Sequence, residues 1–208
     1  MNYAVILSGG VGNRLGLEIP KQYYKVDNKP IIQYVLETIE HHELIDGYVI
    51  VAANEWRAFL RECLEIMYQN MPQAKTKCLG FTEPGENRQL SVYNGLRMLK
   101  GIAKAQDLVL IQDAARANTS AALISSCLML EEDADGAMPV LPMKDTVYLS
   151  YNGRQVDGLL KREQIFAGQA PESFRFGKYL EANEALLPEE ILSINGSTEP
   201  AVKAGMRI

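Results

Sequence analysis

The sequence predicts an α/β protein with a Rossmann-like, mostly parallel sheet and helices on both faces. Apolar runs rich in β-forming residues recur along the 208-residue chain, as strands buried on both faces do. Segments with helical apolar spacing separate these runs, and this alternation is typical of a parallel sheet with right-handed crossovers. Hydrophobic residues make up 47% and charged residues 23%, which is typical of a globular protein. We expect a single domain over residues 1–208.

Four runs predict strands, and four amphipathic segments predict helices. The expected strands are Tyr3–Leu7, Tyr48–Ala53, Leu108–Gln112 and Gly136–Val140. The expected helices are the stretch from Pro30 through Ile39, then Glu55–Asn70, Gln89–Lys100 and Ser120–Leu130. Pro30 suits a first helical turn because its fixed φ is already helical and a first-turn N–H has no partner to lose.

A β-hairpin arm over about residues 144–162 interrupts this rhythm. Two β-rich stretches, residues 146–151 and 155–160, flank Asn152-Gly153, a strong short-range hairpin signal. A two-stranded arm is only marginally stable alone in water, so it should pack against another surface. We therefore predict a homodimer formed through the arm.

Bulk properties exclude several classes of partner. The net charge is −5, so we do not expect the protein to bind nucleic acid or an anionic membrane surface. No apolar run is long enough to span a membrane, and the opening strand reaches Ser8 too soon for a signal peptide, so we expect a cytoplasmic protein. Cys63, Cys78 and Cys127 lack metal-binding spacing, which predicts reduced thiols.

The most informative segment follows the first strand, because ligands of open α/β sheets bind beyond the carboxyl ends of the strands. It runs Ser8-Gly9-Gly10-Val11-Gly12-Asn13-Arg14, and Pro20-Lys21-Gln22 comes soon after. Glycines let backbone N–H groups face phosphate oxygens, and two nearby cations can stabilise charge during transfer to phosphorus. A purely structural turn remains the alternative.

Two familiar glycine motifs do not fit this segment. A Walker A loop would need Gly-Lys-Ser/Thr at its end, and none follows Gly16. The dinucleotide fingerprint would need glycine where Leu15 stands, which disfavours an NAD-dependent oxidoreductase.

Two further polar segments stand next to predicted elements. Residues 84–92, Pro-Gly-Glu-Asn-Arg-Gln-Leu-Ser-Val, precede an apolar helix, and Arg88 offers several donors for a carboxylate or phosphate. Ser91 could cap that helix or contact a base. Asp113-Ala114-Ala115-Arg116 follows a buried strand, where a carboxylate suits a ribose hydroxyl or a magnesium-bound group. For residues 84–92 the alternative is a helix start exposed to solvent. For Asp113–Arg116 the alternative is a simple ion pair at the end of the strand.

Seven motifs in order resemble the sugar-alcohol phosphate cytidylyltransferases, a family that includes the 2-C-methyl-D-erythritol 4-phosphate and ribitol-5-phosphate enzymes. The matching segments are Gly9–Arg14, Pro20–Gln22, Gly85–Ser91, Asp113–Arg116, Lys144–Thr146, Arg162 and Gln169–Phe174, which together extend over nearly the whole chain.

The resemblance implies a reaction in which the acceptor's phosphate oxygen attacks the α-phosphorus of CTP in line. Pyrophosphate leaves, and Mg²⁺ holds the triphosphate. The implied catalytic residues are Arg14 and Lys21. The implied nucleotide-binding residues are Ser8, Gly9, Gly10, Gly12, Gly85, Glu86, Arg88, Ser91, Asp113 and Ala114, with Asp113 also a magnesium ligand. The implied acceptor-binding residues are Arg116, Asp145, Thr146, Arg162 and Thr198, with Arg162 carried by the arm, often across a dimer interface.

Departures from the family pattern concern mainly the acceptor. Ala117 stands where proline is usual, and Gln169-Ala170-Pro171-Glu172 replaces the usual Gln-Thr-Pro-Gln. The family's C-terminal segment is expected to be absent after Ile208. Methylerythritol phosphate is the first expected acceptor, and ribitol 5-phosphate or another polyol phosphate is the alternative. The segments Ser8-Gly9-Gly10 and Asp27–Ile31 resemble the ribitol-phosphate branch of the family more closely. A catalytically silent nucleotide-binding protein is an alternative of another class.

Overall fold

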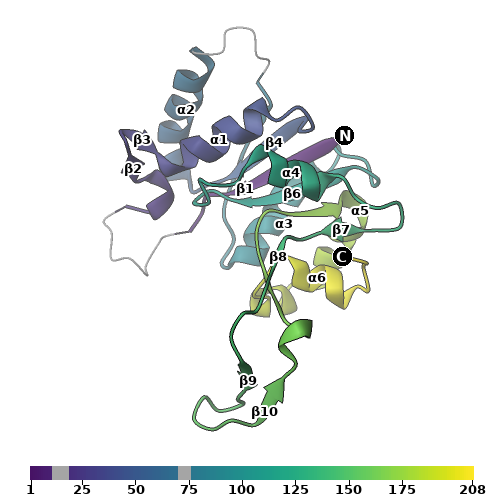
Figure 1. The fold of residues 1–208 in the computed structure, drawn as a ribbon. Helices are drawn as coiled ribbons and strands as arrows, with labels where there is room; N and C mark the ends of the chain where they lie inside the picture. The colour runs from purple at the N-terminus through teal and green to yellow at the C-terminus, as the bar shows by residue number, and fades with distance from the viewer. Residues whose placement is uncertain (11–18, 70–75) are drawn as a thin grey trace.

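The computed structural model describes residues 1–10, 19–69 and 76–208. Its centre is a six-stranded sheet in the order β5-β4-β1-β6-β12-β7 (Figure 1). The strands are β1 (Asn2–Leu7), β4 (Gly47–Val51), β5 (Cys78–Thr82), β6 (Leu108–Asp113), β7 (Gly136–Ala137) and β12 (Glu172–Arg175). The first four of these are mutually parallel, and β12 runs antiparallel between β6 and β7.

Helices cover both faces of this sheet (Figure 1). One face packs against α1 (Ile31–His41), α2 (Asn54–Gln69) and α4 (Ala121–Leu128). The other packs against α3 (Arg88–Leu99), α5 (Phe176–Glu184) and α6 (Thr198–Lys203). β1 and β4 are buried along most of their length because both faces are covered, and this explains their continuous apolar sequences.

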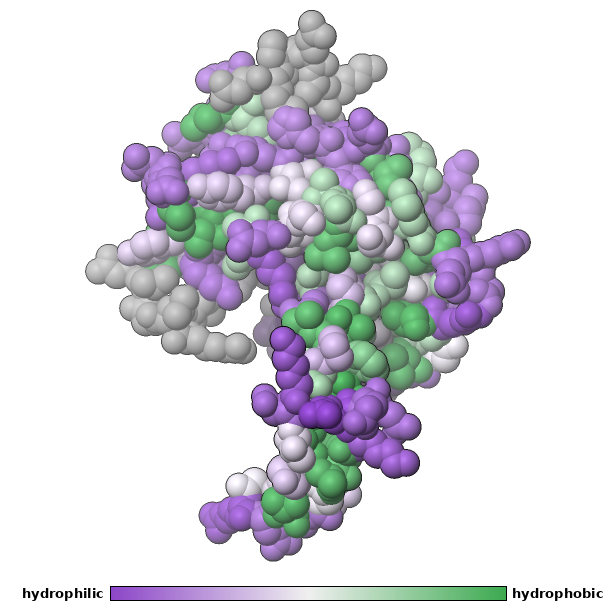
Figure 2. All heavy atoms as spheres, in the orientation of Figure 1, coloured by the Kyte–Doolittle hydropathy of each residue, from purple (hydrophilic) through white to green (hydrophobic). Residues whose placement is uncertain are grey.

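The arm leaves the body through a ribbon of β8 (Val140–Pro142) and β11 (Phe166–Gly168) and ends in β9 (Val147–Leu149) and β10 (Gly158–Leu160). Figure 1 shows it projecting well beyond the helices, and Figure 2 shows apolar side chains along its surface. The two strands are shorter than predicted. Side chains of Asn152 and Asp157 accept hydrogen bonds from backbone N–H groups within residues 150–157, which closes a longer loop.

Short elements complete the described chain: η2 (Lys21–Tyr23), β2 (Lys25–Val26), β3 (Lys29–Pro30), η3 (Arg162–Gln164) and η4 (Glu190–Ser193). In the three described ranges, no helix is long and apolar enough to cross a membrane.

The predicted fold class is confirmed, and so are the predicted helices and first three strands, within a few residues. The fourth predicted strand divides into β7 and β8, because the chain leaves the sheet there to form the arm. The sequence did not predict β5, β12, α5 or α6. β5 is only partly buried, and β12 is a short strand whose place is fixed by pairing with β6.

Candidate active site

The carboxyl ends of three parallel strands bring the predicted segments together. The N–H of Ser8 donates to the carbonyl of Val51 at the end of β4, at 2.8 Å. The N–H of Ala114 donates to the carbonyl of Leu7 at the end of β1, at 3.0 Å. The turn that follows β1 therefore lies between the ends of β4 and β6, at the edge where open α/β sheets bind ligands.

The glycines of this turn differ in what surrounds them. A Cβ at Gly9 would approach the Cβ of Pro84 to 2.4 Å, whereas a Cβ at Gly10 would meet no atom of the described residues within 4 Å. Gly9 is therefore required for packing against the loop before α3, whereas no described side chain crowds Gly10. The contact also places the loop of residues 84–87 directly beside the turn after β1.

Ser91 shapes that loop from the first turn of α3. Its hydroxyl accepts from the N–H of Gly85 at 2.9 Å and donates to the carbonyl of Asn87 at 2.9 Å. Asn87 caps α3 by accepting from the N–H of Leu90 at 2.8 Å. Ser91 thus fixes the loop that carries Gly85 and the exposed Glu86, and base recognition by these three residues stays a prediction.

An ion-pair network joins the second and third predicted segments. Arg88 Nη2 lies 3.0 Å from Asp113 Oδ1, and Arg116 Nε lies 3.2 Å from Asp113 Oδ2. One carboxylate thus holds two guanidinium groups at the end of β6. Because all three side chains remain partly exposed, the network's Coulomb energy is screened, and its main effect is to orient the cations.

Each arginine also contacts the C-terminal half of the chain. Arg88 Nη1 donates to the hydroxyl of Ser197, which is fully buried just before α6. Arg116 Nη1 donates to the side-chain oxygen of Gln169 at 3.3 Å. The sheet edge is therefore completed by segments more than fifty residues away in the sequence.

Glu172 is a buried carboxylate behind this network. It is 8% exposed, accepts from the hydroxyl of Thr198 at 3.4 Å, and leaves its Oε2 without a hydrogen bond in the described part of the chain. Burial raises the pKa of the Glu172 carboxyl, an effect that hydrogen bonding from Ser197 and the nearby Arg88 charge oppose. Thr198, predicted to bind the acceptor, is thereby placed beside the Arg88–Asp113 pair.

Lys21 is the first residue of η2 and is exposed. Within the ranges that the structure describes, its ammonium group forms no ion pair, so it is available to a bound anion. Gly12 and Arg14, the other predicted residues of this segment, lie outside the described residues.

The predicted acceptor-binding residues of the arm lie apart from this edge. Arg162 donates to the carbonyl of Lys144 at 3.0 Å and pairs with Glu163 at 3.9 Å. Asp145 and Thr146 are exposed. Among the described residues, none of the three arm positions forms a hydrogen bond or ion pair with the sheet edge.

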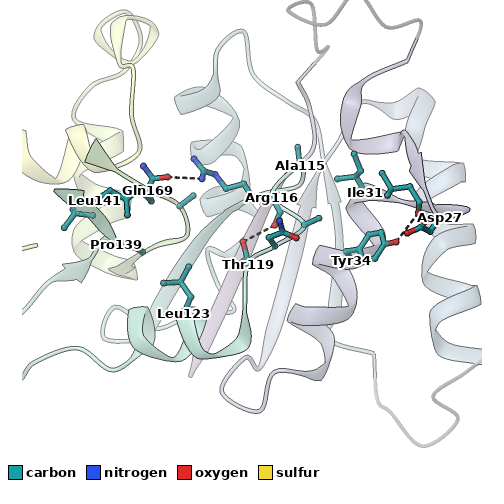
Figure 3. Close-up of a pocket in the computed structure, with 15 residues that line it drawn as sticks. Asp27, Ile31, Tyr34, Ala115, Arg116, Thr119, Leu123, Pro139, Leu141 and Gln169 are labelled. Atoms are coloured by element: carbon teal, nitrogen blue, oxygen red, sulfur yellow. Dashed lines mark hydrogen bonds between the residues drawn. The ribbon is translucent and has the colours of Figure 1, made fainter. Parts of the chain in front are cut away.

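A cavity of about 840 Å³ opens beside Arg116 (Figure 3). Its wall combines the loop after β6 with α1, β8 and the segment before β12. Figure 3 shows Arg116 between Gln169 and Thr119, with Tyr34 and Asp27 on the opposite wall. Arg116 is the only predicted site residue among its described lining. The cavity therefore adjoins the predicted nucleotide site through Arg116, and its described lining includes neither Ser8, Gly9 nor Gly10.

Sequence reasoning assigned no role to three polar residues that organise the site. Gln22 donates to carbonyls of the turn after β1, and Asn87 donates to the carbonyl of Ile191 in η4. The hydroxyl of Ser197 accepts a hydrogen bond from Arg88. Asn87 had a detectable signal, because an asparagine directly before an apolar helical stretch is a typical N-cap. The partners of Gln22 and Ser197 carry no such local signal.

Comparison with known proteins agrees with this geometry. Residues 2–195 match the family model for 2-C-methyl-D-erythritol 4-phosphate cytidylyltransferase, IspD. A 2-C-methyl-D-erythritol 4-phosphate cytidylyltransferase of Geobacter metallireducens is 31% identical over 91% of this chain and 79% of its own. A ribitol-5-phosphate cytidylyltransferase of Streptococcus agalactiae serotype V is 28% identical over 95% of this chain and 81% of its own.

The fold is also found in solved structures. A crystal structure of 4-diphosphocytidyl-2C-methyl-D-erythritol synthase from Anaerococcus prevotii superposes with a TM-score of 0.79, covering 99% of this chain and 82% of that one at 19% identity. A family match over residues 2–195 spans nearly all of the chain, and its motifs meet at one sheet edge. The chain therefore belongs to the 2-C-methyl-D-erythritol 4-phosphate cytidylyltransferase family and is a nucleotidyltransferase that uses CTP.

Proposed function

We propose that this enzyme transfers CMP from CTP to 2-C-methyl-D-erythritol 4-phosphate, giving CDP-methylerythritol and pyrophosphate for isoprenoid precursor synthesis. The observation that carries the proposal is the meeting of three segments at one edge: the turn after β1, the loop before α3 and the end of β6. In a member of this family, that edge is the proposed nucleotide site.

The proposed chemistry is a single displacement at phosphorus. A phosphate oxygen of the acceptor forms a bond to the α-phosphorus of CTP, and the bond from that phosphorus to the bridging oxygen breaks, with its electron pair leaving on pyrophosphate. Negative charge grows on the leaving group and crowds around the phosphorus, so fixed cations and N–H donors lower the barrier. We assign this stabilisation to Lys21 and Arg14.

The nucleotide is proposed to lie across the glycine turn and the α3 loop. Ser8, Gly9, Gly10 and Gly12 would border its phosphates, and Gly85, Glu86 and Ser91 would contact cytosine. Support comes from the loop's fixed shape, in which the N–H of Gly85 is already occupied by the Ser91 hydroxyl. Glu86, which is exposed at the loop's tip, keeps its side chain available for the base. Asp113 and Ala114 would border the ribose.

We propose Mg²⁺ as the metal cofactor, with Asp113 as its protein ligand. Over the described ranges, no group of three or more potential ligand side chains gathers to form a metal site. Mg²⁺ is commonly held by one or two carboxylates together with substrate phosphates, which suits this arrangement. Three guanidinium N–H groups contact the Asp113 carboxylate, which leaves one of its roughly four acceptor positions for the ion. Bound there, Mg²⁺ would neutralise triphosphate charge.

The acceptor is proposed to approach from the Arg116 side of the edge. Arg116 is oriented by Asp113 and Gln169 and also lines the 840 Å³ cavity, so its remaining N–H groups can meet a phosphate. Thr198 would contribute a hydroxyl from the opposite side. Ribitol 5-phosphate is the second candidate acceptor, favoured by the ribitol-5-phosphate cytidylyltransferase at 28% identity over 95% of this chain.

We also propose a homodimer in which the arm brings Arg162, Asp145 and Thr146 to the partner's acceptor site. Support comes from the exposed apolar side chains of the arm, among them Tyr148 at 57% and Leu159 at 68% exposure. These two residues are directly paired across β9 and β10, so they form one apolar surface. The proposed location is the cytoplasm, which agrees with three free cysteines whose pKa burial raises to about 11.

An acceptor panel tests the proposed reaction. The purified chain is incubated with CTP, Mg²⁺ and one polyol phosphate at a time, and pyrophosphate release is measured. We expect turnover with methylerythritol phosphate and at least tenfold lower kcat/KM with ribitol 5-phosphate, a difference of about 1.4 kcal/mol in transition-state binding. The reverse order would establish the ribitol alternative. Tight CTP binding by calorimetry with no turnover on any acceptor would instead indicate a catalytically silent protein.

The proposed dimer is tested by Leu159→Asp, which places a charge on the arm's apolar surface. We expect sedimentation to show a dimer for the original chain and a monomer for the variant. Val202→Asp is the matched control, because Val202 is 62% exposed on α6 and lies outside the arm. A monomeric original chain would refute the proposal.

A further inference from the structure

Gln22 is a buried amide at the site with no role in the function proposed above. It follows Lys21 in η2 and is only 3% exposed. Its Nε2 donates to the carbonyl of Ser8 at 2.8 Å and to the carbonyl of Gly10 at 2.8 Å. Both N–H groups of the side-chain amide are thus used by the turn after β1, which Gln22 closes from one side.

The hydrogen bond to the Ser8 carbonyl also sets the direction of a backbone donor. In a trans peptide the carbonyl and the N–H point to opposite sides. The Ser8 carbonyl faces Gln22, so the N–H of Gly9 points away from Gln22. That N–H meets no acceptor in the described part of the chain, whereas the N–H of Ser8 is paired with Val51. An N–H without an acceptor among the described residues, next to a glycine that no described side chain crowds, is a suitable donor for a phosphate oxygen.

Tyr23 anchors the same element to the rest of the fold. Its hydroxyl accepts from Ser8 Oγ at 2.9 Å and donates to the carbonyl of Ser8 at 2.9 Å. Its ring stacks on Trp56 with centroids 4.3 Å apart and meets Phe59 edge-on at 5.7 Å. η2 is therefore fixed both to the turn after β1 and to α2, and these contacts hold the backbone that carries Lys21 in place.

We propose that Gln22 is a positioning residue that holds the Gly9 N–H and the Lys21 backbone in one fixed relation for the phosphates of CTP. This inference rests on the proposed function. A glutamine suits the task because it donates twice without charge. A carboxylate at the same position would place its lone pairs against two carbonyl oxygens and could not donate to either.

Two substitutions test the role. Gln22→Met keeps the size and removes both donors, and Gln22→Glu also introduces repulsion. The matched control is Gln33→Met, because Gln33 is a buried glutamine on α1 whose amide has Glu37 as its one hydrogen-bond partner in the described chain. We expect both Gln22 variants to stay folded and to lose about 10- to 100-fold in kcat, the usual cost of misplacing reacting groups by an ångström. The KM for the acceptor should change less than about twofold.

A double-mutant cycle with Lys21→Ala separates positioning from a general structural effect. If Gln22 acts through Lys21, the Gln22→Met substitution should matter less once Lys21 is already replaced by Ala. In the Lys21→Ala background, the decrease in log kcat caused by Gln22→Met should be less than half of the decrease that Gln22→Met causes in the original chain. A kcat for Gln22→Met within twofold of the original, at an equal folded fraction by circular dichroism, would overturn the inference. So would full additivity in the cycle.

A binding measurement keeps the inference testable if the proposed reaction itself fails. Should the original chain release no pyrophosphate with any acceptor, CTP is titrated into the original chain and Gln22→Met by calorimetry. We expect at least fivefold weaker CTP binding by the variant and unchanged binding by Gln33→Met. Equal CTP affinity in all three proteins would refute the role of Gln22 independently of the acceptor.

Discussion

The edge of the central sheet and the arm hold their polar residues in opposite ways. At the edge, Asp113 contacts two arginines, and each arginine is fixed again by Ser197 or Gln169. In the arm, Arg162 has only the neighbouring Lys144 carbonyl and Glu163 as described partners. The edge is preorganised within one chain, whereas the arm exposes a cation and an apolar surface, which we propose to contact a second copy of the chain.

This difference predicts which substitutions affect chemistry and which affect acceptor binding. Residues at the edge should change kcat, because preorganised charge acts on the transition state. Substitutions in the arm should change the KM for the acceptor, and the size of this change should depend on the oligomeric state.

Lys21→Ala should have the largest effect, a loss of about 1,000-fold in kcat, because the cation proposed to stabilise the transferring phosphorus is lost. Pyrophosphate release at saturating CTP and acceptor measures it. Lys25→Ala is the control, since Lys25 is an exposed lysine of the neighbouring β2. A loss below tenfold would contradict the catalytic role of Lys21.

Asp113→Asn should lower kcat/KM for CTP by about 100-fold, because two guanidinium groups lose their charged partner and the metal loses a carboxylate. The Mg²⁺ concentration for half-maximal rate should rise as well. Asp157→Asn in the arm loop provides the contrast: Asp157 accepts from the N–H of Tyr151 and should leave both values unchanged. An unaltered Mg²⁺ requirement in Asp113→Asn would exclude Asp113 as the ligand.

Arg162→Ala should raise the acceptor KM about tenfold and leave the KM for CTP unchanged, because a cation for the acceptor phosphate is removed. If the arm serves the partner's site, co-expression with Lys21→Ala should restore activity. Random pairing gives about a quarter of the original sites intact, since half the dimers are mixed and each has one complete site. No restoration would mean that each chain completes its own site.

Glu172→Gln should have the smallest effect, on stability. Burial raises the pKa of the Glu172 carboxyl, so the folded chain binds that proton more tightly than the unfolded chain. The stability contribution is therefore present below the unfolded pKa, about 4.3, and is lost as the pH rises through the higher folded value. The variant, which cannot ionise, should therefore gain thermal stability relative to the original as the pH rises above the unfolded pKa. Glu163→Gln in the exposed η3 should show no such trend.

The sequence predicted the edge better than it predicted the details of contact. The convergence of Ser8 and Asp113 follows from the predicted parallel strands, because such strands present their carboxyl ends at one edge. Arg88 follows β5, a strand that the sequence did not predict, so only the structure places it beside Asp113. The reason for glycine at position 9 did not follow, because Pro84 occupies the space that a side chain would need. Likewise, Ser91 was expected to cap the helix or read a base, and Asn87 is the N-cap while Ser91 holds the loop.

The sequence by itself determined the alternation of strands and helices, the arm and the order of the predicted phosphate-binding motifs, because these depend on local periodicity and turn chemistry. Tertiary structure alone decided that β12 pairs with β6, that Ser197 accepts a hydrogen bond from Arg88, and that Gln22 closes the turn after β1. Such contacts join residues far apart in the chain or on different elements. They form only when packing of the two cores brings the elements together, so no local pattern encodes them.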